Sequence, residues 1–474
     1  MGGALREHDS IGAHVRDMRA DWVAKPRGGE TPARVVRSRS VSQAGFASWH
    51  YVVASVLVGT VGYRLLEFIP ALAVVKPILL ITIAAFGAFV VSTPDSVLHV
   101  PLRLSSSRWM LGFYFWMFAC VPTSVWISAS VSVVRGMVLT GIAAWLLLSL
   151  PKTSASADRL QHGFALSAGV FSLMVALLGG ETFSGRYGAA IGLDVNDIAL
   201  VVAAALPLAI GLALRGRGLL RMVYWSLSAV MVVTIMRTGS RGGGLALLAL
   251  IPVLLIGLPW RRSLQFVLLG VPLATGAWYT APESFRVRMV SLLEGEEDYN
   301  QTDENGRIAI WKRGISYGLE HPVFGVGPNG FITQDGIGKA QRGLQGKWSA
   351  PHNTYVQVFA EMGFPGLLLF VGLIGSVWRV AWRAHRGIPG HPITRRPEYL
   401  ASLVAYVVAA TFLSFLFYHM TWILLAGLAT MATGAIRHES FADGKTAGGA
   451  LGRGNRVRRR GIPRASRVVP APAG

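Results

Sequence analysis

Two arginines beside a glycine-rich turn are the first candidates for chemistry. The stretch TIMRTGSRGGGLALL, residues 234–248, places Arg237 and Arg241 between two long apolar runs. An arginine at a helix start opposes the helix dipole, which favours anions there, and glycines let a backbone approach a ligand closely. A bound anion would explain both features at Arg241, because the guanidinium and the free N–H groups would then point at it together. Arg237 is explained equally well as an interfacial side chain at its helix end.

A third arginine candidate lies in NGRIAIWKRG, residues 305–314, which has the pattern of a short helix. Arg307 falls in the first turn, where an anion is favoured, and Trp311 belongs to the apolar face. We therefore expect Arg307 to contact an anion as well. Lys312 and Arg313 are expected to form a solvated basic face.

A histidine precedes the next long apolar run, in APHNTYVQVFAEMGFPG, residues 350–366. His352 is a candidate general base, since histidine titrates near neutral pH. Asn353 suits the N-cap of the following helix, and Glu361 is predicted to be buried two turns into it. A lone histidine at an interface usually caps or packs, but several arginines are expected on the same surface, which favours a functional role.

Other motifs carry less weight. GVGPNG (325–330) matches a dinucleotide-binding pattern, but the sequence around it lacks a strand–helix unit. Ser240 in RTGSRGG lacks the glycine spacing of a nucleophile elbow. Asp194 and Asp197 open a helix and are explained by capping, with contact to sugar hydroxyls as an alternative. The sequence shows no His, Asp or Glu cluster with convincing metal-ligand spacing.

The elements that must position these residues are membrane-spanning helices. The chain has 474 residues, of which 52% are hydrophobic and 15% charged, and its mean hydropathy is +0.47. Its apolar runs are about 18–25 residues long, and roughly 20 helical residues cross a bilayer. This predicts an all-α, polytopic integral membrane protein. Cys120, the single cysteine, excludes an intramolecular disulfide and a cysteine-based metal site.

About twelve spans are predicted. They cover residues 51–68, 72–92, 109–128, 131–150, 160–180, 196–214, 219–236, 242–259, 263–281, 353–378, 399–418 and 420–437. The predicted domains are a disordered basic cytoplasmic arm at 1–48, a transmembrane domain at 49–438 and a disordered basic tail at 439–474. The N-terminus has no apolar stretch typical of a cleavable signal peptide.

Basic residues predict the orientation of these spans. Placing the arm in the cytoplasm puts the even-numbered connections, which are rich in arginine, on the cytoplasmic side together with the C-terminal tail. The odd-numbered connections are mostly short and poor in Lys and Arg, and the long one is close to neutral. This distribution explains the net charge of +21 without nucleic-acid binding. Arg186, Arg237 and Arg241 then lie outside, as does the 71-residue connection 282–352. So long a connection is usually functional, and it is expected to form short helices over the outer mouth.

Together these motifs resemble the O-antigen ligase and polysaccharide polymerase superfamily of bacterial inner-membrane glycosyltransferases. The resemblance covers about residues 180–380 and rests on DVNDIALVVAAALPL, TGSRGG, NGRIAIW, HPVFGVGPNGF and APHNTYVQ in this order. It implies a GT-C-like helical fold with a large periplasmic loop. It also implies transfer of a glycan from undecaprenyl diphosphate to a hydroxyl of lipid A–core oligosaccharide or of another glycan. The reaction would use neither a nucleotide sugar nor a metal cofactor.

The resemblance also assigns residues. The family's arginine in the glycine-rich turn falls on Arg241, its loop arginine on Arg307 and its histidine on His352. The two arginines would stabilise charge on the departing diphosphate, and the histidine would take the acceptor proton in an inverting displacement. Residues of second rank for binding diphosphate or glycan are Arg186, Arg237, Asn353, Trp311 and Glu361.

Three alternatives remain open from the sequence. Within the family, a polymerase that joins lipid-linked repeat units is almost as well supported as a ligase acting in lipopolysaccharide assembly. A transporter of lipid-linked oligosaccharide or solute would be expected to show two related halves, which this sequence does not. A non-catalytic assembly protein would tolerate substitution of Arg241 or His352.

Overall fold

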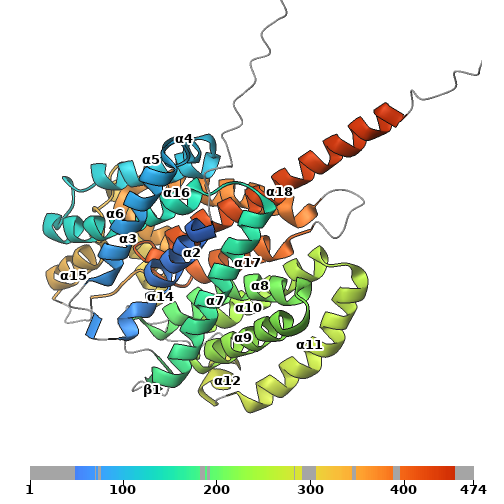
Figure 1. Cartoon of the computed structure of the whole chain (residues 1–474). Helices are drawn as coiled ribbons and strands as arrows, with labels where there is room; N and C mark the ends of the chain where they lie inside the picture. The colour runs from blue at the N-terminus through green and yellow to red at the C-terminus, as the bar shows by residue number, and fades with distance from the viewer. Residues whose placement is uncertain are drawn as a thin grey trace, which may run out of the picture. The chain divides into compact units, whose positions relative to one another are not determined.

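A computed structural model describes most of the chain between residues 48 and 453 (Figure 1). The described residues are 48–69, 71–72, 76–181, 187–188, 193–281, 283–290, 306–343, 348–387 and 395–453. They are helical apart from turns and one antiparallel pair of two-residue strands, β1 (Gly180–Glu181) and β2 (Tyr187–Gly188). The all-α class is thereby confirmed. The predicted N-terminal arm and Arg186 lie outside the described residues, except for Ser48.

The helices follow the predicted spans in order. Their bounds are α2 (Ser48–Leu57), the π-helix η2 (Val58–Gly62), the 3-10 helix η3 (Leu65–Phe68), α3 (Pro77–Ser92), α4 (Pro94–His99), η5 (Pro101–Arg103), α5 (Ser105–Ala119), α6 (Ile127–Ser149), α7 (Ser154–Leu178), α8 (Val195–Arg215), α9 (Gly218–Arg237), α10 (Arg241–Gly257), α11 (Trp260–Thr280), α12 (Glu283–Val290), α14 (Arg307–Glu320), α15 (Phe331–Gln341), α16 (Thr354–Arg386), α17 (Pro397–Ala410) and α18 (His419–Arg453). The last helix continues past residue 438, where the predicted transmembrane domain ends.

Six described helices are long and apolar enough to cross a membrane, or seven if α3 and the bent continuation after it count as one span. The six are α6, α7, α8, α9, α16 and residues 419–436 of α18. Shorter apolar helices cover 48–62, α10 and α17. Each predicted span overlaps a helix, and the multi-pass class is confirmed. The count of twelve crossings stays a prediction.

The first predicted pair of spans is broken more than expected. α2 gives way to the π-helix η2 and the short η3, and between them Arg64 adopts a left-handed backbone with φ of 54°. The Arg64 guanidinium pairs there with the Glu67 carboxylate. α3 begins at Pro77 rather than at residue 72, because proline favours the first helical turn. It ends in a bend of 110° before α4.

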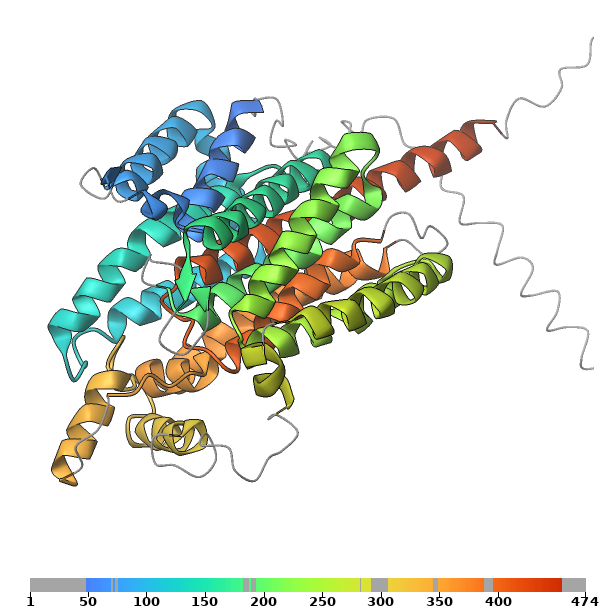
Figure 2. The same cartoon turned by 90° about the horizontal axis from the view of Figure 1, so that it is seen from below.

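Connections predicted to be outside gather at one end of the bundle, called here the loop end because α14 and α15 lie there (Figure 2). At this end the first turn of α10 packs against α8, since a Cβ built on Gly243 would lie 2.7 Å from that of Ala199. Gly242 in turn lies against Phe412, which follows α17. The long connection forms short helices, as predicted, in α12, α14 and α15.

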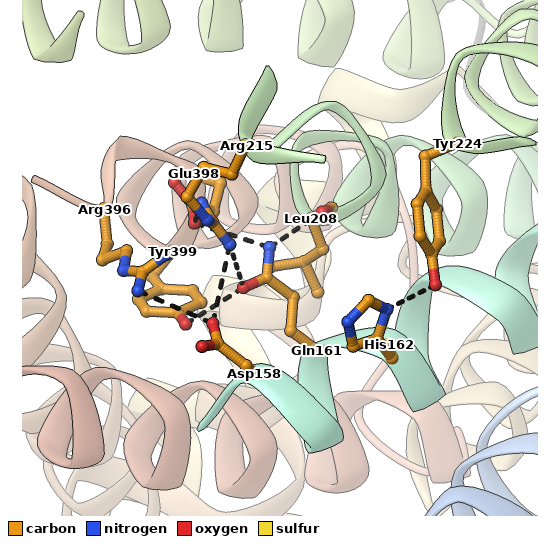
Figure 3. Close-up of polar contacts among 9 residues, drawn as sticks. All are labelled: Asp158, Gln161, His162, Leu208, Arg215, Tyr224, Arg396, Glu398 and Tyr399. Carbon is orange, nitrogen blue, oxygen red and sulfur yellow. Dashed lines mark hydrogen bonds and ion pairs between the residues drawn. The ribbon is translucent and has the colours of Figure 1, made fainter. Parts of the chain in front are cut away.

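Connections predicted to be cytoplasmic gather at the opposite end, called here the far end. Arg215 at the end of α8 pairs with Glu398 at the start of α17 and donates a 2.9 Å hydrogen bond to Gln161 of α7 (Figure 3). Tyr399 donates to the same amide oxygen at 3.1 Å, and Arg396 lies 3.6 Å from Asp158. Buried charges need such partners, so this network ties α7, α8 and α17 together.

One predicted span ends early. Residues 399–418 are continuously apolar in sequence, but α17 stops at Ala410 and the chain continues without helix to Tyr418. We call residues 411–418 the turn segment. Its main chain bonds to the start of α16, where the Thr354 hydroxyl donates to Leu413 O at 2.6 Å and accepts from Phe415 N at 2.9 Å. These long-range bonds replace helical ones, so hydropathy alone misplaces the boundary.

Another predicted span contains a break. α16 has a non-helical backbone at Gly363, with φ of 65°. A Cβ there would lie 2.4 Å from the carbonyl oxygens of Pro322 and Val323, so the glycine permits this close approach. Proline at position 365 adds to the interruption. The break divides the buried first turns of α16 from its long apolar remainder.

Candidate functional site

The TGSRGG turn sets the start of α10. Gly239 takes a φ of 59°, a conformation that glycine adopts without steric cost. Ser240 is the N-cap, and its hydroxyl oxygen accepts from Gly243 N at 3.2 Å. Thr238 accepts from Ser240 N at 3.3 Å. This framework makes Arg241 the first helical residue, half-buried, at the positive end of the α10 dipole.

His352 is held by its main chain. Its φ is 49°, a left-handed conformation that a residue with a side chain rarely adopts. The amide donates to the Ser414 hydroxyl of the turn segment at 2.8 Å. Asn353 directly after it caps α16, accepting from Tyr355 N and Val356 N at 2.9 and 3.0 Å. Strained conformations of this kind concentrate at functional sites. This one sets the direction in which the half-buried His352 side chain leaves the main chain.

α14 brings Arg307 to the same region. Gly306 is the N-cap, and Arg307 is the first helical residue. One turn on, the Trp311 indole donates to the carbonyl of Pro351 at 2.9 Å. Residues four apart share a helix face, so Arg307 and Trp311 both face the segment that carries His352. Asn353 and Trp311 therefore position this segment through their hydrogen bonds.

The segments that carry the three candidates are linked by contacts at the loop end. Gly242, next to Arg241, packs on Phe412 of the turn segment, while His352 bonds to Ser414. Arg307 belongs to the helix that binds Pro351, one residue before His352. The α10 N-terminus and His352 thus both contact the turn segment, and α14 contacts the segment that carries His352. Helix N-termini that each carry an arginine suit a doubly charged anion.

Glu361, expected as a secondary contact for diphosphate or glycan, binds the main chain of a loop. Its carboxylate is 1% exposed and accepts from Asn329 N at 3.1 Å and Phe331 N at 3.4 Å. It thereby holds the GVGPNG turn, in which Gly325 and Gly327 have positive φ. The motif is thus a packed turn, and Glu361 supports it through main-chain bonds.

The prediction that Lys312 and Arg313 form a solvated basic face is wrong for Arg313. Lys312 is exposed, but the Arg313 guanidinium contacts the buried carboxylate of Asp335 at 2.6 Å. Lys339 approaches the other oxygen of that carboxylate at 3.0 Å. Asp335 is fully buried and also accepts from Ser349 N. This ion cluster fixes α14 to α15, because a buried carboxylate needs its cations.

Arg237 lies at the end of α9, beside an apolar cavity of about 260 Å³. The cavity is lined by residues from the loop-end halves of α7 and α9, among them Leu173 and Val233. Its apolar wall fits the interfacial explanation of Arg237 as well as a role beside the site.

Sequence reasoning missed the turn segment and its polar side chains. Ser414 and Thr354 join the turn segment to the start of α16, and Tyr418 donates to Asp197 at 2.5 Å. Burial and the nearby Asp197 carboxylate raise the pKa of Tyr418 well above its usual range, so the hydroxyl stays protonated. Asp197 also completes the capping box with Asp194, as predicted. The apolar run 399–418 gave no signal of these contacts.

The candidate site contains two arginines, each at the N-terminus of a helix. The described ranges contain no group of three His, Cys, Asp or Glu side chains arranged to hold a metal ion. Arginines at helix N-termini are the groups that could stabilise an anion there.

Comparison with known proteins gives one family match. No curated protein matches the chain. Residues 226–371 match the model of the family described as O-antigen ligase, Wzy_C. The matched stretch includes Arg241, Arg307 and His352, and it confirms the resemblance found in the sequence. Residues 226–371 of this multi-pass membrane protein are therefore similar to the O-antigen ligase family.

Proposed function

We propose that the protein transfers a glycan from undecaprenyl diphosphate to the hydroxyl of a sugar acceptor, as an O-antigen ligase does. The observation that carries this proposal is the meeting of three segments at the loop end. The N-termini of α10 and α14 and the His352 turn all contact the turn segment or its direct neighbours, within the stretch that matches the O-antigen ligase family.

The reaction requires stabilisation of a departing anion. The bond between the anomeric carbon and the phosphate oxygen breaks, and its electron pair stays on the diphosphate. Arg241 and Arg307 are the groups that stabilise this added charge, which counts most in the transition state. The N–H groups of both helix starts add to the same field.

The acceptor forms the new glycosidic bond through its hydroxyl oxygen. Its hydroxyl oxygen attacks the anomeric carbon from the side opposite the diphosphate, so a single displacement inverts the configuration. The His352 imidazole accepts the hydroxyl proton. Trp311 and Asn353 hold the His352 segment, while Arg237 is a secondary contact for the diphosphate or glycan. This chemistry takes no step through a metal cofactor.

We place the reaction at the periplasmic face of the bacterial inner membrane, with both termini in the cytoplasm. The support is the distribution of basic residues, since arginine-rich connections gather at the far end. The partners are the lipid-linked glycan donor, a sugar-hydroxyl acceptor and membrane lipids. The protein would then act in polysaccharide biosynthesis for the cell envelope.

A deletion strain complemented with wild type, Arg241→Ala or His352→Ala tests the proposal. Lipid-linked and envelope glycans would be extracted and their chain lengths compared by mass. We expect long lipid-linked chains that do not reach their final acceptor in both variants. Single repeat units that accumulate would indicate a polymerase instead. Full rescue by both variants at wild-type protein levels would refute the catalytic role.

A further inference from the structure

A second group of nitrogen-bearing side chains lies at the far end, away from the proposed catalytic residues. It consists of His385 near the end of α16 and of Arg395 and Arg396 just before α17, and we call it the 385/395/396 cluster. The Arg396 amide donates to Ala384 O at 2.8 Å, which places the two arginines beside His385. A Cβ on Gly257 of α10 would lie 2.9 Å from the His385 ring and 2.2 Å from Pro397. Three helix ends therefore enclose the cluster.

Each residue of the cluster has an unsatisfied buried nitrogen. His385 Nδ1, Arg395 Nε and Arg396 Nη1 are buried and make no hydrogen bond with any described residue. The His385 side chain itself is only 6% exposed. Buried polar groups in proteins are nearly always hydrogen-bonded. Three such nitrogens, on residues that adjoin where α16 ends and α17 begins, indicate that a hydrogen-bonding partner binds beside them.

The chain offers little negative charge for this role. Its sequence contains no acidic residue between Glu361 and Glu398, whereas five arginines lie in the same stretch. Glu398 is already paired with Arg215 of α8. Asp158 lies 3.6 Å from Arg396 and 3.9 Å from Arg215, so one carboxylate serves two cations (Figure 3). The cluster thus keeps a surplus of positive charge.

Aromatic side chains place the cluster near a membrane interface. The Trp382 ring stacks on His385, with ring centroids 5.5 Å apart, and is 39% exposed. Trp260, which begins α11 shortly after Gly257, is 71% exposed and lies near Arg261. Tryptophan and arginine gather at the depth of lipid headgroups, where phosphate groups are the abundant anions.

We propose that the 385/395/396 cluster binds a phosphate group, as carried by an anionic lipid headgroup or by free phosphate. Guanidinium groups match phosphate oxygens in paired hydrogen bonds, and basic sites between helix ends bind lipid headgroups. A bound phosphate would join the ends of α10, α16 and α17. This site is independent of the proposed transfer reaction.

The full-length protein in phosphatidylcholine nanodiscs provides the test. Its thermal midpoint would be measured alone, with phosphatidylglycerol mixed into the discs, and with inorganic phosphate in solution. We expect phosphatidylglycerol to raise the midpoint of the wild type. Arg395→Gln should weaken its apparent affinity about tenfold, the usual cost of one hydrogen bond to a charged group. Arg383→Gln, an exposed arginine of α16, removes the same charge and should change the affinity less than about twofold.

The two sources of phosphate give different results. A midpoint raised by inorganic phosphate without phosphatidylglycerol, and lost in Arg395→Gln, would assign the site to free phosphate. Should Arg395→Gln not fold, Arg395→Lys keeps the charge but removes the planar fork, and it should show an intermediate loss. The proposal is overturned if neither probe stabilises the wild type, or if both stabilise the variants as strongly.

Discussion

Replacing Gly243 by alanine should impair glycan transfer without removing any proposed functional side chain. A Cβ at this position would lie 2.7 Å from the Cβ of Ala199 and 3.2 Å from Ile235 Cγ2. Carbon atoms in good contact are about 3.5–4.0 Å apart, so the first turn of α10 must move by roughly 1 Å from α8. Arg241 is two residues away in the same turn, so it moves as well.

The expected loss can be estimated. A displacement of about 1 Å at a reacting group costs on the order of 100-fold in rate, and overpacking costs roughly 1–3 kcal/mol of stability. The assay is the initial rate of transfer by purified protein from a polyprenyl-diphosphate-linked glycan, with the thermal midpoint measured in parallel. We expect the rate to fall much more than the folded fraction does.

Alanine substitutions at three other glycines should differ in their effect on the transfer rate. Gly242→Ala would meet Phe412 at 3.3 Å and should cause a smaller loss, and Gly244→Ala meets only the flexible end of Met289. Gly136→Ala in α6 meets nothing within 4 Å and is the matched control, expected to keep the rate or to add stability. A wild-type rate in Gly243→Ala, or equal losses in all four variants, would refute the idea that α10 packing sets the position of Arg241.

Three further substitutions test the site. Arg241→Ala should raise the transfer barrier by about 2–4 kcal/mol with little change in thermal midpoint, and Arg241→Lys should recover part of the rate; equal rates in Ala and wild type would exclude an anion contact. Asp335→Asn leaves the Arg313 guanidinium without its carboxylate and should cost about 3–5 kcal/mol in chemical unfolding, whereas a change below about 1 kcal/mol would show the pair to be dispensable. Trp311→Phe removes the hydrogen bond to the Pro351 carbonyl and should cost about 1 kcal/mol of stability, detectable as a lower midpoint, and an unchanged midpoint would contradict its positioning role.

Local patterns predicted much of this molecule. Hydropathy located the helices, and the capping residues Asp194 and Asn353 marked helix starts correctly. The TGSRGG turn and the NGRIAIW helix start were recognisable because glycine and capping effects act over a few residues. The sequence therefore supplied Arg241, Arg307 and His352 as candidates before their neighbours were known.

The features that the sequence did not predict depend on contacts between residues that are distant in the chain. The turn segment resembles a helix in composition, and it leaves helical geometry because Ser414 and Leu413 bond to the start of α16. The burial of Arg313 depends on Asp335, which is 22 residues away. Hydropathy patterns do not report such pairings, since a cation on a helix surface and one in an ion pair look alike in sequence.

The break at Gly363 has a consequence for how the outer loop can vary. The carbonyl oxygens of Ala360 and Glu361 accept from Val326 N and Gly327 N at 2.9 and 3.0 Å. Because main-chain atoms make these bonds, the bonds do not depend on the identity of the loop's side chains. A loop grafted from a relative could therefore dock on the same carbonyl groups, provided that it keeps small residues at the tight turns. The loop and the framework on which it docks could then be varied separately, as long as a new loop keeps Arg307 and Trp311 of α14.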